Sequence, residues 1–174
     1  APRRASDLEM KALRGAAISM VFQSPRAALN PIRGIGRQVM DALDAHQASS
    51  SRDLRARALE LLQAVLIRDP DKRFDAYPDE LSGGMCQRVM IAMAIASNPA
   101  LLIADEPTTG LDVTTQKAVM DLLARLTAER NMAMILITHD LGLAARYCTD
   151  VAVMQHGQVV EQAAAARLFQ APRH

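Results

Sequence analysis

The chain has 174 residues, of which 50% are hydrophobic and 22% charged, a composition typical of one globular domain with room for a sizeable core. The net charge of +1 and the aromatic content of 3% argue against the basic surface and the base-stacking platform of a nucleic-acid-binding protein. No apolar run approaches the roughly 18 residues of a membrane-spanning helix, so we expect any membrane association to go through a partner.

The first half of the chain is predicted to contain a short helix, one strand and then a long helical region. The predicted elements are, in order, a helix over residues 7–14, a strand over 17–22, a helix over 35–43, and a helix that is capped by serines 49–51 and ended by Asp69-Pro70. The stretch from the end of the strand to Pro31 and Gly36 reads as loop. We therefore expect residues 24–98 to be a helical insertion between two strands.

The second half alternates helices with strands. The predicted elements are a buried helix from 83 to 96, a strand over 101–104, a helix capped by Asp112 and stopped at Asn131, a strand over 132–138, a helix over 141–148, and a hairpin over 151–161 that turns at His156-Gly157. This order predicts an α/β fold with a mainly parallel sheet, right-handed crossovers and an antiparallel pair at its margin.

Two adjacent carboxylates follow the apolar run at residues 101–104. Pro107 ends the run, so Asp105 and Glu106 are expected at the carboxyl edge of a buried strand. Ligands bind at that edge in open α/β sheets, and side chains alternate along a strand. We expect the two carboxylates to point differently, one toward a cation and the other toward a water. Taken alone, the pair also fits a solvated strand-to-loop junction.

Four short motifs stand in a fixed order along the chain. Gln23 follows a strand, Ser82-Gly83-Gly84 precedes a buried helix, Asp105-Glu106 follows a second strand, and His139 follows a third. Each motif is weak by itself, because a capping serine, a solvated glutamine or a loop histidine would explain it. Together, in these contexts, they resemble the ATPase subunit of ATP-binding-cassette (ABC) transporters.

The resemblance implies a role for each motif. Residues 81–85 are similar to the signature motif, residues 101–105 to the Walker B strand and Leu111-Asp112 to the D-loop. Gln23 resembles the Q-loop glutamine, Glu106 the catalytic glutamate and His139 the switch histidine. Nucleotide-binding residues are then Gln23, Ser82, Gly83, Gly84, Asp112 and His139, and the catalytic pair is Glu106 and His139.

The residue types suit this chemistry. Glycines 83 and 84 leave a helix N-terminus bare, so its N–H groups and dipole can face a phosphate of ATP. Mg²⁺ prefers oxygen ligands, which Asp105 offers with help from the amide oxygen of Gln23. Glu106 would orient the attacking water. His139 would donate a hydrogen bond to the γ-phosphate.

The resemblance implies a P-loop NTPase domain in three segments: residues 1–23 as core strand and start of the Q-loop, 24–98 as helical subdomain with the signature motif, and 99–174 as catalytic core. No Gly-x-x-x-x-Gly-Lys-Ser/Thr sequence occurs among the 174 residues. We therefore expect a truncated domain, an internal fragment without the Walker A loop. The fragment alone is expected to hydrolyse little or no ATP.

Within the family, residues 22–25, 29–31 and 105–114 most resemble importers of dipeptides, oligopeptides and nickel. The resemblance implies a subunit on the cytoplasmic face of the membrane. Its expected partners are a second ATPase subunit, two transmembrane permeases and, indirectly, a substrate-binding protein, without nucleic acid. Two alternatives stay open: a non-transport ABC ATPase, and a non-catalytic partner subunit.

Some residues depart from the family pattern, namely Asp79, Cys86, Gly110 and Ala163. Cys86 stands in the signature helix where a basic residue is usual, which puts the phosphate contact in some doubt. A thiol at a helix start can also have a depressed pKa and raised reactivity. Cys86 and Cys148 have no metal-ligand spacing, which favours a reduced, cytosolic chain.

Overall fold

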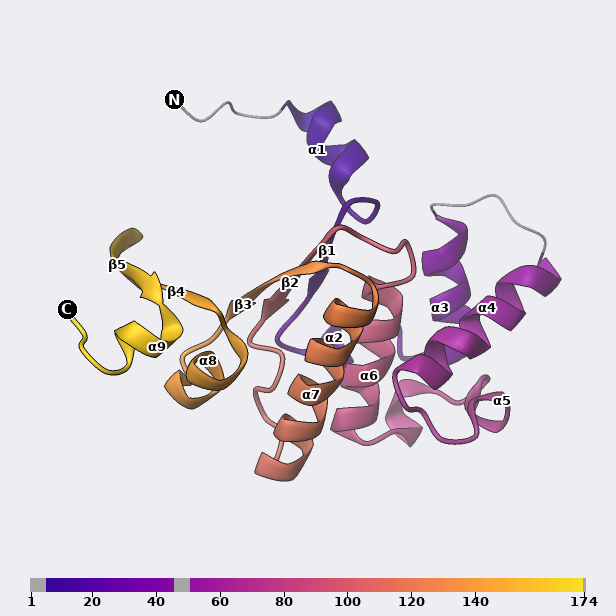
Figure 1. The fold of residues 1–174 in the computed structure, drawn as a ribbon. Helices are drawn as coiled ribbons and strands as arrows, with labels where there is room; N and C mark the ends of the chain where they lie inside the picture. Colours follow the sequence, from indigo (N-terminus) through magenta and orange to yellow (C-terminus); the bar gives the residue numbers. More distant parts are fainter. Residues whose placement is uncertain (1–5, 46–50, 174) are drawn as a thin grey trace. The chain divides into compact units, whose positions relative to one another are not determined.

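The computed structural model describes residues 6–45 and 51–173, and the chain forms two compact units, Ala1–Ile135 and Leu136–His174 (Figure 1). The strand order of the main sheet is β1-β2-β3, where β1 is Ile18–Val21, β2 is Leu101–Asp105 and β3 is Ala133–Ile137. A separate two-stranded sheet belongs to the second unit. The predicted α/β class is confirmed.

The strands β1 and β2 are parallel, and Val21 is level with Ala104 in their register. Residues alternate between two faces along these strands. Leu102 and Ala104 are fully buried. Leu101, Ile103 and Asp105, which alternate with them along the strand, are half-buried. A backbone hydrogen bond positions the start of β3, since Ala133 N–H donates to Ala100 O, just before β2, at 2.9 Å.

Eight helices accompany these strands within the described part of the first unit. They are α1 (Asp7–Leu13), α2 (Pro25–Ala28), α3 (Ile35–Asp44), α4 (Ser51–Ala64), α5 (Pro70–Arg73), the 3₁₀ helix η1 (Pro78–Glu80), α6 (Gly83–Ala94) and α7 (Val113–Glu129). The apolar helix α6 packs against β1, α2, α3, α4 and α7, which explains why it is apolar nearly all round. Figure 1 shows α6 and α7 side by side.

The end of α4 differs from the prediction. The helix ends at Ala64 instead of at Asp69-Pro70. Leu66 adopts a left-handed φ of 61°, Leu66 N–H bonds to Gln63 O, and Ile67 N–H bonds to Leu62 O. These two bonds form a Schellman motif, which usually has glycine at the left-handed position. Pro70 then opens α5, so the proline starts a helix where the sequence predicted a stop.

The stretch predicted as loop after β1 contains a short helix. Pro25 is the first residue of α2, and its fixed φ suits that position. Two other helix ends have clear local causes. Asn131 ends α7 with φ 49°, and Ser6 and Glu9 form a capping box for α1. Ser49 and Ser50, two of the three serines predicted to cap α4, lie outside the described residues.

The second unit contains α8 (Leu141–Tyr147), β4 (Asp150–Gln155), β5 (Gln158–Ala164) and α9 (Ala165–Leu168). The strands β4 and β5 pair antiparallel, with an irregularity between Val153 and Met154. The predicted turn is confirmed, because His156 and Gly157 both have positive φ, as a tight hairpin turn requires. Across the described residues, no helix combines the length and hydrophobicity needed to cross a membrane.

Candidate functional site

The carboxyl ends of β1 and β2 bring three predicted site residues to one edge of the sheet. The register pairs Val21 with Ala104, and beyond this pair Gln23 lies two residues past the end of β1 while Asp105 ends β2 and Glu106 follows it. Parallel strands end at the same edge, so Gln23, Asp105 and Glu106 come at the same edge of the sheet. This edge is the first part of the candidate site.

Asp105 and Glu106 differ in backbone conformation. Asp105 is the last residue of β2 and is half-buried. Glu106 has φ 48°, a left-handed conformation that strains a residue with a side chain. Its carboxylate accepts a hydrogen bond from Thr109 Oγ1 at 2.8 Å, and its carbonyl accepts one from Thr109 N–H at 3.2 Å. The turn therefore holds Glu106 just beyond the strand.

The start of α6 has the form that a phosphate contact needs. Ser82 is the N-cap, and its Oγ accepts a hydrogen bond from Met85 N–H at 3.3 Å. Gly83 and Gly84 supply the next N–H groups, which have no intrahelical acceptor at this position. Together with the helix dipole, these groups favour an anion at this end of α6.

Gly84 also has a packing role that the sequence did not reveal. A Cβ built on Gly84 would lie 2.5 Å from Thr115 Cγ2, closer than any real contact. A Cβ on Gly83 would meet only Leu111 Cδ2, at an ordinary 3.6 Å. The starts of α6 and α7 thus touch at Gly84 and Thr115.

Asp112 is the N-cap of α7, as predicted. Its Oδ1 accepts a hydrogen bond from Thr115 N–H at 3.0 Å and its Oδ2 one from Thr115 Oγ1 at 2.6 Å. The hydroxyl of Thr115, followed by its N–H, lowers the pKa of this exposed carboxyl. Because Thr115 touches Gly84, Asp112 and the glycines of α6 lie in one neighbourhood. The structure brings these predicted residues together.

His139 belongs to the second unit. It is exposed, follows β3 and precedes Asp140, whose Oδ1 accepts a hydrogen bond from Leu143 N–H at 3.1 Å as N-cap of α8. A capped helix therefore begins directly after the histidine.

Arg26 is a site neighbour that sequence reasoning missed. Its Nη2 donates to the carbonyl oxygen of Leu81 at 3.3 Å, across 55 residues of sequence. Leu81 immediately precedes the N-cap of α6, and Arg26 lies three residues after Gln23. An arginine in a predicted loop carries no local signal of such a contact.

The expectation of a reactive Cys86 thiol is wrong. Cys86 is fully buried, and its Sγ donates to Pro78 O at 3.4 Å. Burial raises the pKa of the Cys86 thiol, and the nearby Arg26 guanidinium lowers it only in part. Both cysteines are free.

The donor atoms at the sheet edge suit Mg²⁺. Among the residues with described positions, no group of three or more His, Cys, Asp or Glu could hold a metal by itself. A hard cation that keeps several waters and phosphate oxygens needs only one carboxylate and an amide oxygen. Asp105 and Gln23 offer these two ligands.

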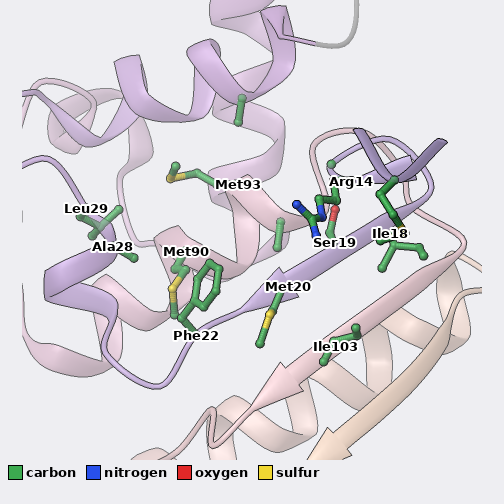
Figure 2. Close-up of a pocket in the computed structure, with 14 residues that line it drawn as sticks. Arg14, Ile18, Ser19, Met20, Phe22, Ala28, Leu29, Met90, Met93 and Ile103 are labelled. Carbon is green, nitrogen blue, oxygen red and sulfur yellow. The ribbon is translucent and has the colours of Figure 1, made fainter. Parts of the chain in front are cut away.

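A hollow of about 690 Å³ lies beside β1 (Figure 2). Its lining is mainly apolar and includes Met20 and Phe22 of the β1 segment, Met90 and Met93 of α6, and Ile103 of β2. Phe22 is 51% exposed although it is a large aromatic residue. Figure 2 shows the Phe22 ring next to Met90. The residue before Gln23 thus borders an open apolar surface.

Residues 3–109 match the sequence profile of the ABC transporter family. The chain is 52% identical over 172 residues to the dipeptide transport ATP-binding protein DppD of Escherichia coli (strain K12), covering 99% of this chain and 53% of that protein. It is 47% identical over 169 residues to the oligopeptide transport ATP-binding protein OppD of Bacillus subtilis (strain 168), covering 97% of this chain and 47% of that protein. The chain spans about half the length of these curated relatives.

Solved structures give the same picture of the fold. The chain resembles the ATP-binding cassette MJ0796 in a dimeric post-hydrolysis state bound to ADP and Pi, with a TM-score of 0.79 and 31% identity. That similarity covers 92% of this chain and 68% of the cassette. The fold is therefore that of a nucleotide-binding cassette.

Proposed function

Since the chain belongs to the ABC transporter family, we propose that it is the greater part of the ATP-hydrolysing domain of a peptide importer. One observation carries the proposal. The strands β1 and β2 are parallel neighbours, so Gln23, Asp105 and Glu106 follow or end them at the carboxyl edge, which is where open α/β sheets bind ligands. The relatives named as dipeptide and oligopeptide transport proteins support the choice of peptides, and nickel is the other cargo that the motifs suggest.

The edge residues would divide the chemistry between them. Asp105 and the amide oxygen of Gln23 would hold Mg²⁺, which neutralises charge on the phosphates when bound. Glu106 would orient the attacking water and draw off its proton, because its backbone turn holds the carboxylate beyond the strand. His139 would donate a hydrogen bond to the γ-phosphate.

The helix starts would form the second half of a site shared by two subunits. Ser82 Oγ and the N–H groups of Gly83 and Gly84 would bind a phosphate of ATP held by the other subunit. Asp112 would lie at the same contact, since Thr115 joins it to Gly84. The similar cassette solved as a dimer with ADP and Pi supports this arrangement.

We expect the phosphate loop to come from sequence outside these 174 residues. The chain alone would then turn over little or no ATP, since the Walker A sequence does not occur in its 174 residues. The partners we propose are a second ATPase subunit, two permeases that contact residues 24–98, and a substrate-binding protein. The subunit would be held at the cytoplasmic face of the membrane by its contacts with the permeases.

The decisive experiment is ATP turnover with Mg²⁺ by the complete gene product together with its permeases. Glu106→Gln should lower the turnover by about 10²–10⁴-fold while ATP still binds, because the general base is lost. Glu129→Gln is the matched control, since Glu129 is exposed on the surface of α7, where it pairs with Arg125. Unchanged turnover in Glu106→Gln would remove Glu106 from the mechanism.

The cargo is tested separately. Proteoliposomes that contain the transporter and its binding protein should take up a labelled dipeptide in an ATP-dependent manner. Uptake of ⁶³Ni²⁺ without peptide uptake would transfer the proposal to nickel. Copurification with nucleic acid instead of permeases would favour a non-transport ABC ATPase.

A further inference from the structure

Arg26 links two segments of the proposed site that lie far apart in the sequence. It belongs to the short helix α2, which begins two residues after Gln23. Its Nη2 donates a hydrogen bond of 3.3 Å to Leu81 O, and α2 packs against α6. The side chain therefore reaches from the Gln23 loop to the peptide that enters the first turn of α6.

The bonded carbonyl belongs to the peptide that joins Leu81 to Ser82. Leu81 is 3% exposed, so its side chain anchors one end of this peptide. At the other end, Ser82 has an extended backbone, and its carbonyl accepts the first helical bonds from Met85 at 3.0 Å and Cys86 at 2.9 Å. Rotation of this peptide would tilt Ser82 and the N–H groups that follow it. The guanidinium opposes that rotation with a charge-assisted bond.

The turn that Arg26 bonds is also held from inside α6. The thiol of Cys86 is buried and donates to Pro78 O at 3.4 Å, which ties the start of α6 to η1. The nearby Arg26 guanidinium partly offsets the rise that burial causes in the pKa of this thiol.

We propose that Arg26 is a positioning residue that fixes the entry turn of α6, residues 81–84, relative to the Gln23 loop. This role rests on the proposed function. It makes the orientation of the phosphate-binding N–H groups depend on the place of Gln23. The Mg²⁺ ligand at the sheet edge and the phosphate contact at α6 are thereby held in a fixed relation within one subunit.

The test uses the complete gene product with its permeases and compares Arg26→Ala with Arg26→Lys. Arg26→Ala should lower kcat about tenfold with little change in KM for ATP, because the entry turn of α6 loses its charge-assisted bond and the phosphate-binding N–H groups are misplaced. Arg26→Lys should recover much of the loss, since an ammonium group still donates to Leu81 O. Arg33→Ala is the matched control, because Arg33 lies in the same segment and pairs with exposed Asp41 at 2.6 Å.

Hydrogen exchange separates this proposal from the proposed function. Amides 82–86 should exchange faster in Arg26→Ala than in wild type, whether or not the protein hydrolyses ATP. If wild type shows no turnover but exchange changes as stated, the function fails and the link stands. The link would be overturned if Arg26→Ala showed the same exchange rates at amides 82–86 and the same kcat as the wild type. An equal kcat loss in Arg26→Lys and Arg26→Ala, with a lowered Tm in both, would also overturn it.

Discussion

The contact between Gly84 and Thr115 gives the sharpest prediction about how the site is built. In Gly84→Ala, the new Cβ would lie 2.5 Å from Thr115 Cγ2, so one of the two helix starts must shift. Thr115 cannot turn away freely, because its Oγ1 bonds to Asp112 at 2.6 Å. The substitution therefore disturbs both the packing of α6 on α7 and the cap of α7.

Gly83→Ala is the matched control for the magnitude. Both glycines lie in the first turn of α6, so both substitutions gain the same helix propensity, up to about 1 kcal/mol. Only Gly84→Ala adds a clash, and overpacking costs about 1–3 kcal/mol. We expect Gly83→Ala to be neutral or slightly stabilising, and Gly84→Ala to be less stable than Gly83→Ala by about 1–3 kcal/mol.

Urea unfolding of the wild type and of each variant measures this difference. A second substitution, Thr115→Ser, removes the clashing methyl and keeps the hydroxyl that bonds to Asp112. It should restore most of the stability of Gly84→Ala in a double-mutant cycle. Equal stabilities for the two glycine variants, or no rescue by Thr115→Ser, would refute the close packing of α6 on α7.

Three further predictions concern single groups. The pKa of Asp112 is lowered in the folded state, so its cap stabilises above the usual pKa of about 4 and is lost as pH falls through the folded value; Asp112→Asn should lack this acid-dependent loss in unfolding experiments. Because Cys86 is fully buried and Cys148 only half-buried, Cys86 should react with iodoacetamide more slowly than Cys148 in the native protein, and at a similar rate in urea, as peptide mass spectrometry would measure. Because Glu106 has a left-handed φ of 48°, the free energy of unfolding in urea should be about 1 kcal/mol higher for Glu106→Gly than for Glu106→Ala. Equal unfolding free energies would contradict the backbone strain at Glu106.

The local signals of the sequence predicted most of the elements. Asp112 as a cap, Asn131 as a helix stop and the turn at His156-Gly157 were predicted correctly, because each depends on atoms a few residues apart. The end of α4 was missed for the complementary reason. Its left-handed residue is Leu66 instead of glycine, so the Schellman motif had no compositional signal.

In the candidate site, too, some features depend on the local sequence and others on the packing of distant segments. The sequence by itself determined which residue types follow each strand and precede each helix, and hence the identity of Gln23, Asp105, Glu106 and the signature glycines. It could also place the two carboxylates at a strand end, since proline stops the ladder locally.

Only the tertiary structure decided how these pieces meet. The bond from Arg26 to Leu81, the contact of Gly84 with Thr115 and the burial of Cys86 join segments that are distant in sequence. Such contacts depend on how helices pack, and neither the periodicity nor the propensity of one segment encodes its neighbour. Side chains in the entry turn of α6 therefore acquire their surroundings, and the Cys86 thiol its raised pKa, only when the chain has folded.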